Sequence, residues 1–304
     1  MKESLKAIKR IDVHAHATAF PQFAPPFPSG YRMNNAEEVI EMYDKLNIEK
    51  GILLPLGVEG QFQVIPSEEC AYVASQHPDR FEWFCYVDPR ARGYSTKEDL
   101  SKTLMHYKKL GAKGVGELMA QMYIDDPYMD NLFYHCAECD MPVTIHIAPQ
   151  ISGYYGIVDD LGLPRLEKML KKHKNLKILG HSQLFWAEIS ADLTAKERDG
   201  YPTGKVKEPG RITQLMREYE NLYCDVSANS GMNALMRDPD HAHKFIEEFS
   251  DRLLYGCDYT ATFNTHTYEM NDFLSEITDN GIMSDENFYK FVRGNAVKLL
   301  DIKN

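Results

Sequence analysis

The sequence contains no apolar run long enough to cross a membrane, which takes about 20 residues. Residues 1–6 (MKESLK) are charged and lack the apolar core of a signal peptide. No low-complexity stretch or linker divides the 304 residues, so we expect one domain over residues 1–304. With 43% hydrophobic and 26% charged residues, the composition is typical of a globular protein, and we expect a cytoplasmic location with no membrane partner.

The chain has fewer positively charged than negatively charged residues. The 34 Lys and Arg residues face 45 Asp and Glu residues, which gives a net charge of -11. Such a balance argues against a nucleic-acid phosphate backbone as the main ligand, and therefore against a deoxyribonuclease. The expected partner is a small-molecule substrate.

Two further motif classes are missing. Cys136 and Cys139 form a CxxC pair, but no second pair accompanies it, so the six cysteines are interpreted as buried reduced thiols. No glycine-rich phosphate turn follows the first apolar run, which disfavours a dinucleotide-binding fold.

What the chain does contain is a regular alternation of short apolar runs and helical segments. The predicted strands cover residues 11–16, 51–56, 81–87, 115–119, 143–147, 176–181, 222–226 and 253–258. Residues 36–46, 95–110, 128–139, 163–173, 212–219 and 241–249 have helical spacing between them. Strands that alternate with helices indicate a parallel sheet, and eight such units predict an α/β fold of the (β/α)8 TIM-barrel type. Residues 267–277 and 286–300 add further helix at the C-terminal end, and an open doubly wound sheet is the alternative.

Polar residues stand at the ends of five predicted strands. The six are His14 and His16 on the first strand, Glu117 on the fourth, His146 on the fifth, His181 on the sixth and Asp258 on the eighth. A barrel gathers its catalytic groups at the carboxyl ends of its strands. Side chains two apart on a strand share a face, so His14 and His16 should point to one place. We therefore expect a metal site built from these six residues.

Imidazole and carboxylate ligands suit Zn²⁺, with Mn²⁺ or Fe²⁺ as alternatives, and one or two ions would fit. Such an ion lowers the pKa of a bound water towards ~7. Asp258 is the candidate to accept and return the proton. His181 is the candidate to polarise a substrate carbonyl or to stabilise an anion.

The segments after the first, fifth and sixth strands are long, as in lids over an active site. They carry Tyr154, Tyr155, Trp186 and Arg32, which we expect to contact a small, partly apolar substrate. The aromatic residues could equally pack in a subunit interface, so a homodimer is an open alternative.

This ordered set of motifs resembles the amidohydrolase superfamily, and most closely its amidohydrolase 2 branch. Residues 293–296 (RGNA) before the final apolar residues are similar to the closing helix of that branch. The resemblance extends from Ile11 to Leu300. It implies metal binding by His14, His16, His146 and Asp258, with His181 either binding a second metal or acting in catalysis.

The fourth strand separates two functions that the resemblance allows. Many binuclear members carry a carbamylated lysine there and some carry glutamate, whereas the aminocarboxymuconate-semialdehyde decarboxylase group generally has no ligand on this strand. Lys113 shares strand parity with Glu117 but lies deeper, so Glu117 is the better candidate. We therefore expect a metal-dependent hydrolase that cleaves a C–N or C–O bond in an amide, lactone or ester.

Two alternatives remain. One is a nonoxidative decarboxylase, for which Arg32, Arg165 and Arg211 are candidate carboxylate partners. The other is a non-catalytic metal-binding protein.

Overall fold

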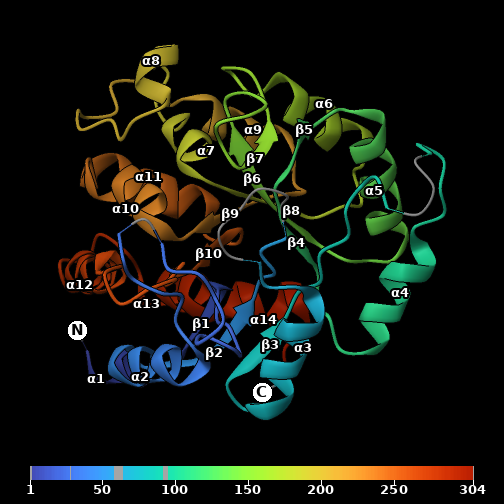
Figure 1. The fold of residues 1–304 in the computed structure, drawn as a ribbon. Helices are drawn as coiled ribbons and strands as arrows, with labels where there is room; N and C mark the ends of the chain where they lie inside the picture. The colour runs from blue at the N-terminus through green and yellow to red at the C-terminus, as the bar shows by residue number, and fades with distance from the viewer. Residues whose placement is uncertain (1, 28, 58–63, 92–94, 304) are drawn as a thin grey trace.

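The eight predicted strands all form, around one axis (Figure 1). The structure is a computed structural model that describes residues 2–27, 29–57, 64–91 and 95–303. The barrel strands are β1 (Arg10–Ala15), β2 (Ile48–Leu53), β3 (Phe81–Trp83), β4 (Val115–Leu118), β6 (Val143–Ala148), β8 (Ile178–His181), β9 (Leu222–Val226) and β10 (Leu253–Tyr255). Most of their residues are buried, because helices cover the outer face and side chains fill the interior.

The strands pair in parallel and close into a barrel. β1, β2 and β3 pair in that order, and β4, β6, β8, β9 and β10 form a second series. A parallel bridge between Cys85 and Val115 joins the two series. On the other side, the Asp258 N–H donates to the His14 carbonyl at 2.8 Å, next to the end of β10. The predicted TIM barrel is therefore confirmed.

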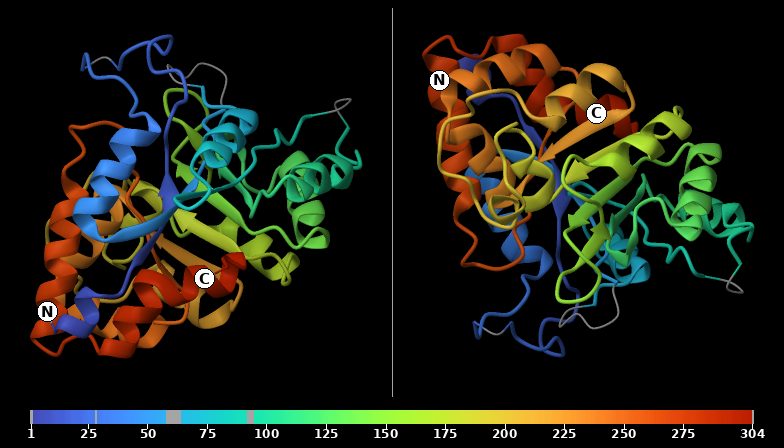
Figure 2. Two further views of the ribbon diagram at one scale, coloured as in Figure 1. Left: turned by 90° about the horizontal axis from the view of Figure 1, so that it is seen from below. Right: turned by 90° about the horizontal axis from the view of Figure 1, so that it is seen from above.

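Two short strands were not predicted. β5 (Ala120–Tyr123) follows β4 almost directly, and β7 (Gly156–Val158) pairs in parallel with both β5 and the end of β6. Part of the chain beyond the carboxyl ends of β4 and β6 is thus ordered as sheet. The segment between β1 and α2 instead projects from the body of the molecule, in blue in both views of Figure 2.

Helices cover the outside of the barrel (Figures 1 and 2). They are α1 (Glu3–Lys6), α2 (Ala36–Leu46), α3 (Ser67–Gln76), α4 (Ser101–Lys109), α5 (Pro127–Glu138), α6 (Pro164–Lys172), α7 (Gln183–Ala187), α8 (Ala195–Arg198), α9 (Arg211–Glu218), α10 (Ala228–Met236), α11 (Pro239–Phe249) and α12 (His266–Asp279). The helix predicted to start at residue 95 starts at Ser101, whose N–H donates to the Asp99 carboxylate. Among the described helices, none is long and apolar enough to cross a bilayer.

The C-terminal segment closes the amino end of the barrel. It consists of α13 (Asp285–Tyr289), a π-helical turn η1 (Lys290–Gly294) and α14 (Asn295–Leu300). Ala296, Leu300 and Ile302 pack against an apolar cluster that comprises Ile11, Val13, Ile52, Leu54, Phe84, Leu179 and Leu254. The additional C-terminal helix is therefore confirmed, and it seals the end opposite the predicted site.

All six cysteines are buried and free of disulfides. Cys136 lies in α5 and Cys139 caps its end, so the CxxC pair belongs to the packing of this helix. This agrees with the expectation of reduced structural thiols.

Candidate metal centre

His14 and His16 share one face, as their spacing predicts, and an irregularity in β1 accompanies their placement towards the cluster. The register against β2 shifts between Asp12 and Ala15, where three steps along β1 match two along β2. Ile11 and Val13 contribute to the apolar barrel cluster, whereas Asp12 accepts a hydrogen bond from Tyr43 of α2. Such a shift re-aims a side chain beside an active site. It allows the backbone to place both Val13 and His14 on the inner side.

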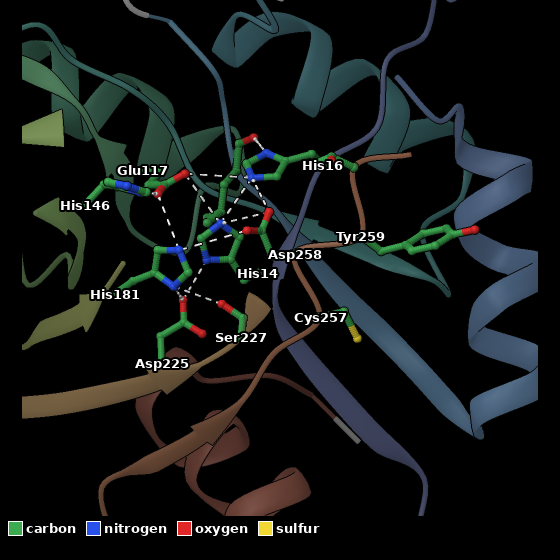
Figure 3. A network of polar contacts seen from close by, with 12 residues as sticks. His14, His16, Glu117, His146, His181, Asp225, Ser227, Cys257, Asp258 and Tyr259 are labelled. Atoms are coloured by element: carbon green, nitrogen blue, oxygen red, sulfur yellow. Dashed lines mark hydrogen bonds and ion pairs between the residues drawn. The ribbon is translucent and has the colours of Figure 1, made fainter. Parts of the chain in front are cut away.

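Four histidine rings from three strands converge at the carboxyl end of the barrel (Figure 3). The His14 Nε2 lies 3.1 Å from the His16 Nε2. The His14 and His181 ring centroids are 4.3 Å apart, and those of His146 and His181 are 5.3 Å apart. The cluster predicted from strand ends is therefore brought together in space.

Glu117 lies between the two halves of this cluster. One carboxylate oxygen is 3.4 Å from the His14 Nε2 and 3.8 Å from the His16 Nε2. The other contacts the His146 Nδ1 and lies 3.8 Å from the His181 Nε2. A second register shift, between Val115 and Leu118 of β4, accompanies this inward placement.

Gly116 makes that placement possible. Its φ is +134°, and a Cβ there would lie 2.6 Å from the Thr144 carbonyl oxygen. Any other residue would push β4 away from β6 and displace Glu117.

Asp258 completes the ring from the loop after β10. Its Oδ1 is 3.5 Å from the His16 Nε2 and 3.8 Å from the His14 Nε2, and its Oδ2 is 4.0 Å from the His181 Nε2. Burial, followed by the charge of neighbouring carboxylates including Glu117, raises the pKa of Asp258 to about 7 despite the attraction of His14. A carboxyl group near neutrality can both accept and donate a proton.

The outer partners of the rings indicate that the cluster is built for a cation. The His14 Nδ1 donates to Asp225 at 2.6 Å, and the His16 Nδ1 donates to the Leu54 carbonyl at 2.9 Å. In the neutral rings, both Nε2 lone pairs then point at one place across 3.1 Å. Two lone pairs at this distance repel unless a proton or a metal ion lies between them. The donor set therefore fits a divalent cation.

The pKa values agree with this demand for positive charge. Burial alone would lower the pKa of His14, but Asp225, Glu117 and Asp258 outweigh it and raise that pKa well above its usual range. Burial and the nearby His14 lower the pKa of His16 to about 4 and that of His181 to about 3. Burial would raise the pKa of Glu117, yet His146 and His14 hold it well below its usual range. The low pKa values of Glu117, His16 and His181 favour an ionised carboxylate and two neutral rings, the protonation states that metal ligation requires, while the raised pKa of His14 reflects the demand of the surrounding carboxylates for positive charge.

Asp225 and Asp12 are buried acids that the sequence analysis missed. Asp225 lies on β9 and faces His14, while Asp12 accepts the backbone N–H groups of His14 and Cys257. The available signal was an acidic residue within an apolar strand that should be buried on both faces.

A cavity of about 940 Å³ opens onto the cluster. Among the predicted substrate residues, Tyr154 and Tyr155 line it, together with Phe27, Gln121, Asp199, Tyr201 and Asn229. The Tyr155 ring centroid lies 4.5 Å from that of His146, and the Tyr154 hydroxyl donates to Asp199 at 2.6 Å across the opening. Among the described residues that line the cavity there is no Lys or Arg.

Two predicted substrate residues lie elsewhere. Trp186 is 1% exposed in α7, and its Nε1 donates to the Asp225 carbonyl behind the cluster, so the expectation that it contacts substrate is wrong for this geometry. Arg32 forms a bidentate ion pair with Glu38 and lines a separate small hollow. The other candidate cations, Arg165 and Arg211, pair with Asp125 and Glu167.

Lys113 is also removed from the site. The register shift in β4 breaks the parity between Lys113 and Glu117 that the sequence indicated. The Lys113 Nζ donates to the Asp301 carbonyl at the opposite end of the barrel. Glu117 is thus the strand-four group at the cluster.

Comparison with known proteins assigns the chain to a family. The amidohydrolase profile of the second type matches residues 11–302. The chain belongs to this amidohydrolase family. The family is metal-dependent, in agreement with the donor set described above, and a search of curated proteins finds no significant match.

Solved structures share the fold of this amidohydrolase. An uncharacterized TIM-barrel protein from Bordetella bronchiseptica has 19% identity and a TM-score of 0.65, over 97% of this chain and 99% of that one. A probable 2-pyrone-4,6-dicarboxylic acid hydrolase from Acinetobacter baumannii with bound citric acid has 14% identity and a TM-score of 0.60, over 97% and 100%. A dihydroxybenzoic acid decarboxylase from Polaromonas sp. JS666 with bound manganese has 18% identity and a TM-score of 0.61, over 96% and 97%. At these identities the likeness shows the fold alone.

Proposed function

We propose that this amidohydrolase is a metal-dependent hydrolase that cleaves a C–N or C–O bond in a small, partly apolar amide, lactone or ester. The observation that carries the proposal is the position of Glu117, whose two oxygens face different pairs of histidines. Two three-residue donor groups share it, namely His14 with His16 and His146 with His181. A carboxylate shared in this way supports a two-ion centre, with Zn²⁺ as the first candidate and Mn²⁺ or Fe²⁺ as alternatives.

In this proposal, His14, His16, Glu117, His146, His181 and Asp258 hold the ions. The ions supply Lewis acidity, which polarises a carbonyl group and lowers the pKa of water. Asp258, which lines the cavity, accepts the proton of the attacking water and returns it to the leaving nitrogen or oxygen. Tyr155 and Tyr201 supply ring surface for the apolar part of the substrate.

Metal stoichiometry tests the proposal. Wild-type protein loaded with Zn²⁺ or Mn²⁺ and dialysed should hold about two ions per chain, and Glu117→Ala should hold about one. Lys113→Ala is the matched control, because Lys113 lies just before the same strand, at the amino end of the barrel, and its loss should leave the metal content unchanged. An equal metal content in wild type and Glu117→Ala would contradict the shared role of Glu117.

The alternative is a nonoxidative decarboxylase, which the manganese-containing dihydroxybenzoic acid decarboxylase among the fold neighbours supports. The two reactions differ in their products. A panel of esters, lactones, amides and hydroxybenzoic acids, followed by both acid release and CO₂ release, separates them. CO₂ release without any hydrolysis would replace the hydrolase proposal.

A further inference from the structure

Asp225 is a buried carboxylate that contacts histidines from two different strands. Asp225 has no exposed surface. It lies on β9, which pairs with β10 on one side and with β8 on the other, and β10 in turn contacts β1. Its Oδ2 is 2.6 Å from the His14 Nδ1 and 3.5 Å from the His181 Nδ1. In Figure 3, Asp225 lies on the side of both rings that faces away from Glu117.

Ser227 connects Asp225 to the second ring. The Ser227 Oγ lies 3.0 Å from the His181 Nδ1, and the hydroxyl also hydrogen bonds to Asp225. Ser227 occupies the N-cap position of α10, where a serine normally accepts a backbone N–H, yet its side chain makes no such bond. The hydroxyl thus joins His181 to Asp225 instead of capping the helix.

The absence of a side chain at Gly256 leaves room for the Asp225 carboxylate. A Cβ on Gly256 would lie 2.7 Å from the Asp225 Oδ1 and 3.3 Å from the His14 Cβ. The Trp186 Nε1 donates to the Asp225 carbonyl at 2.9 Å, which fixes the end of β9. A side chain at position 256 would therefore displace the carboxylate from its place beside both rings.

We propose that Asp225 is a shared positioning residue, which fixes the proton of both His14 and His181 on Nδ1 and so turns both Nε2 lone pairs towards the metal centre. His14 donates to it directly and His181 donates through Ser227. A single carboxylate thereby couples a ligand on the first strand to a ligand or catalytic ring on the sixth. The inference rests on the metal centre proposed above and is independent of which bond the enzyme cleaves.

Ring-nitrogen NMR of the metal-free protein tests the proton positions without any substrate. The His14 and His181 signals are assigned with the His14→Gln and His181→Gln variants. Both rings should carry the proton on Nδ1 in the wild type. Ser227→Ala should change the His181 signals and leave those of His14 in place, whereas Asp225→Asn should change both. A wild-type ring protonated only on Nε2 would overturn the proposal even if Asp225→Asn did not fold.

Metal affinity gives the second readout, by titration of metal-free protein with Zn²⁺ or Mn²⁺. Outer partners of metal-binding histidines contribute about 10- to 100-fold in affinity, and Asp225→Asn should lose that much. Asp159→Asn is the matched control, because Asp159 is equally buried but binds backbone N–H groups away from the cluster. It should bind metal within about threefold of the wild type.

The outcomes separate the two proposals. An Asp225→Asn protein that keeps its circular dichroism spectrum and binds metal as tightly as the wild type would overturn the role of Asp225. A wild type that binds no metal would overturn the proposed function, and the NMR result would still decide whether Asp225 positions the two rings.

Discussion

At the amino ends of the strands the interior of the barrel is filled with hydrocarbon, whereas at the carboxyl ends it is filled with histidines and carboxylates. Phe84, Leu179 and Leu254 represent the first end, where α14 covers the cluster. His14, Glu117 and Asp225 represent the second, where every group needs a partner of opposite charge or a hydrogen bond. Burial of apolar side chains stabilises a fold, while burial of charged groups costs stability unless they are paired. The two ends thus divide stability and chemistry between them.

The largest effect is expected at the carboxyl end, on rate. Asp258→Asn removes the proposed proton acceptor, and turnover should fall by about 10²- to 10⁴-fold. Thermal unfolding should move little, because this residue lies on the open side of the cluster. The rate is measured on the ester, lactone or amide that the substrate panel identifies. Turnover within about threefold of wild type would contradict the assignment of the chemistry to the carboxyl end of the barrel.

The reverse pattern is expected at the amino end. Phe84→Ala removes a fully buried ring from the apolar cluster, and the free energy of unfolding should fall by about 3–5 kcal/mol. Chemical denaturation gives this value. The metal content of the folded variant should equal that of the wild type, and loss of metal at unchanged stability would contradict the comparison.

Asp159 is a buried acid outside the metal cluster, so it shows the effect of burying a carboxylate on stability apart from metal binding. Burial raises the pKa of Asp159 to about 6, despite the backbone N–H groups that it accepts. The folded state therefore holds a proton that the unfolded state releases at lower pH, so the free energy of unfolding falls as pH rises through the window between about 4 and 6.

In Asp159→Asn this contribution is absent. The stability of the wild type relative to the variant should decline across that window by up to about 3 kcal/mol, and it should be flat above it. Denaturation at several pH values measures the difference. If the wild type gained stability relative to the variant as pH rises, the expectation would be wrong, because the ionised form of Asp159 would then stabilise the fold.

The smallest effect is expected for Lys113→Ala. Lys113 lies just before β4, the strand that carries Glu117. Its side-chain ammonium donates to the Asp301 carbonyl at the amino end of the barrel. Loss of that exposed contact should cost less than about 1 kcal/mol in denaturation. A larger cost, or a changed metal content, would show that the two ends are coupled along this strand.

The sequence was sufficient for the barrel because each barrel strand, even the three-residue β3 and β10, lies in an apolar run that helical segments separate from the next. β5 and β7 escaped prediction because no helix separates either of them from the barrel strand before it, and their pairing depends on neighbours distant in sequence. The helix after β3 starts later than predicted, at Ser101, where the Ser101 N–H donates to the Asp99 carboxylate just ahead of the helix.

The candidate site was predictable as far as strand ends decide it. His181 ends β8 and His146 lies near the end of β6, in the expected order, and the structure brings them beside Glu117. The regular alternation of side chains along a strand did not predict every inward-facing residue. The register shifts in β1 and β4 change which side chains face inward, and no residue pattern announces them.

The sequence also did not distinguish aromatic residues that line the cavity from those that are buried. Tyr155 and Trp186 both follow barrel strands, and only the packing of α7 decides that one lines the cavity and the other is buried. Asp225 was missed because its partners come from β1 and β8, which are far from it in the sequence.

The buried indole of Trp186 offers an optical probe of this centre. The chain contains two tryptophans, and the indole N–H of one donates to the backbone of Asp225 while the other packs beside Tyr107 outside the cluster. A Trp83→Phe protein would therefore carry Trp186 as its single tryptophan, bonded to the backbone of the residue whose carboxylate contacts His14. Its emission would follow metal uptake in real time, with no label and no substrate.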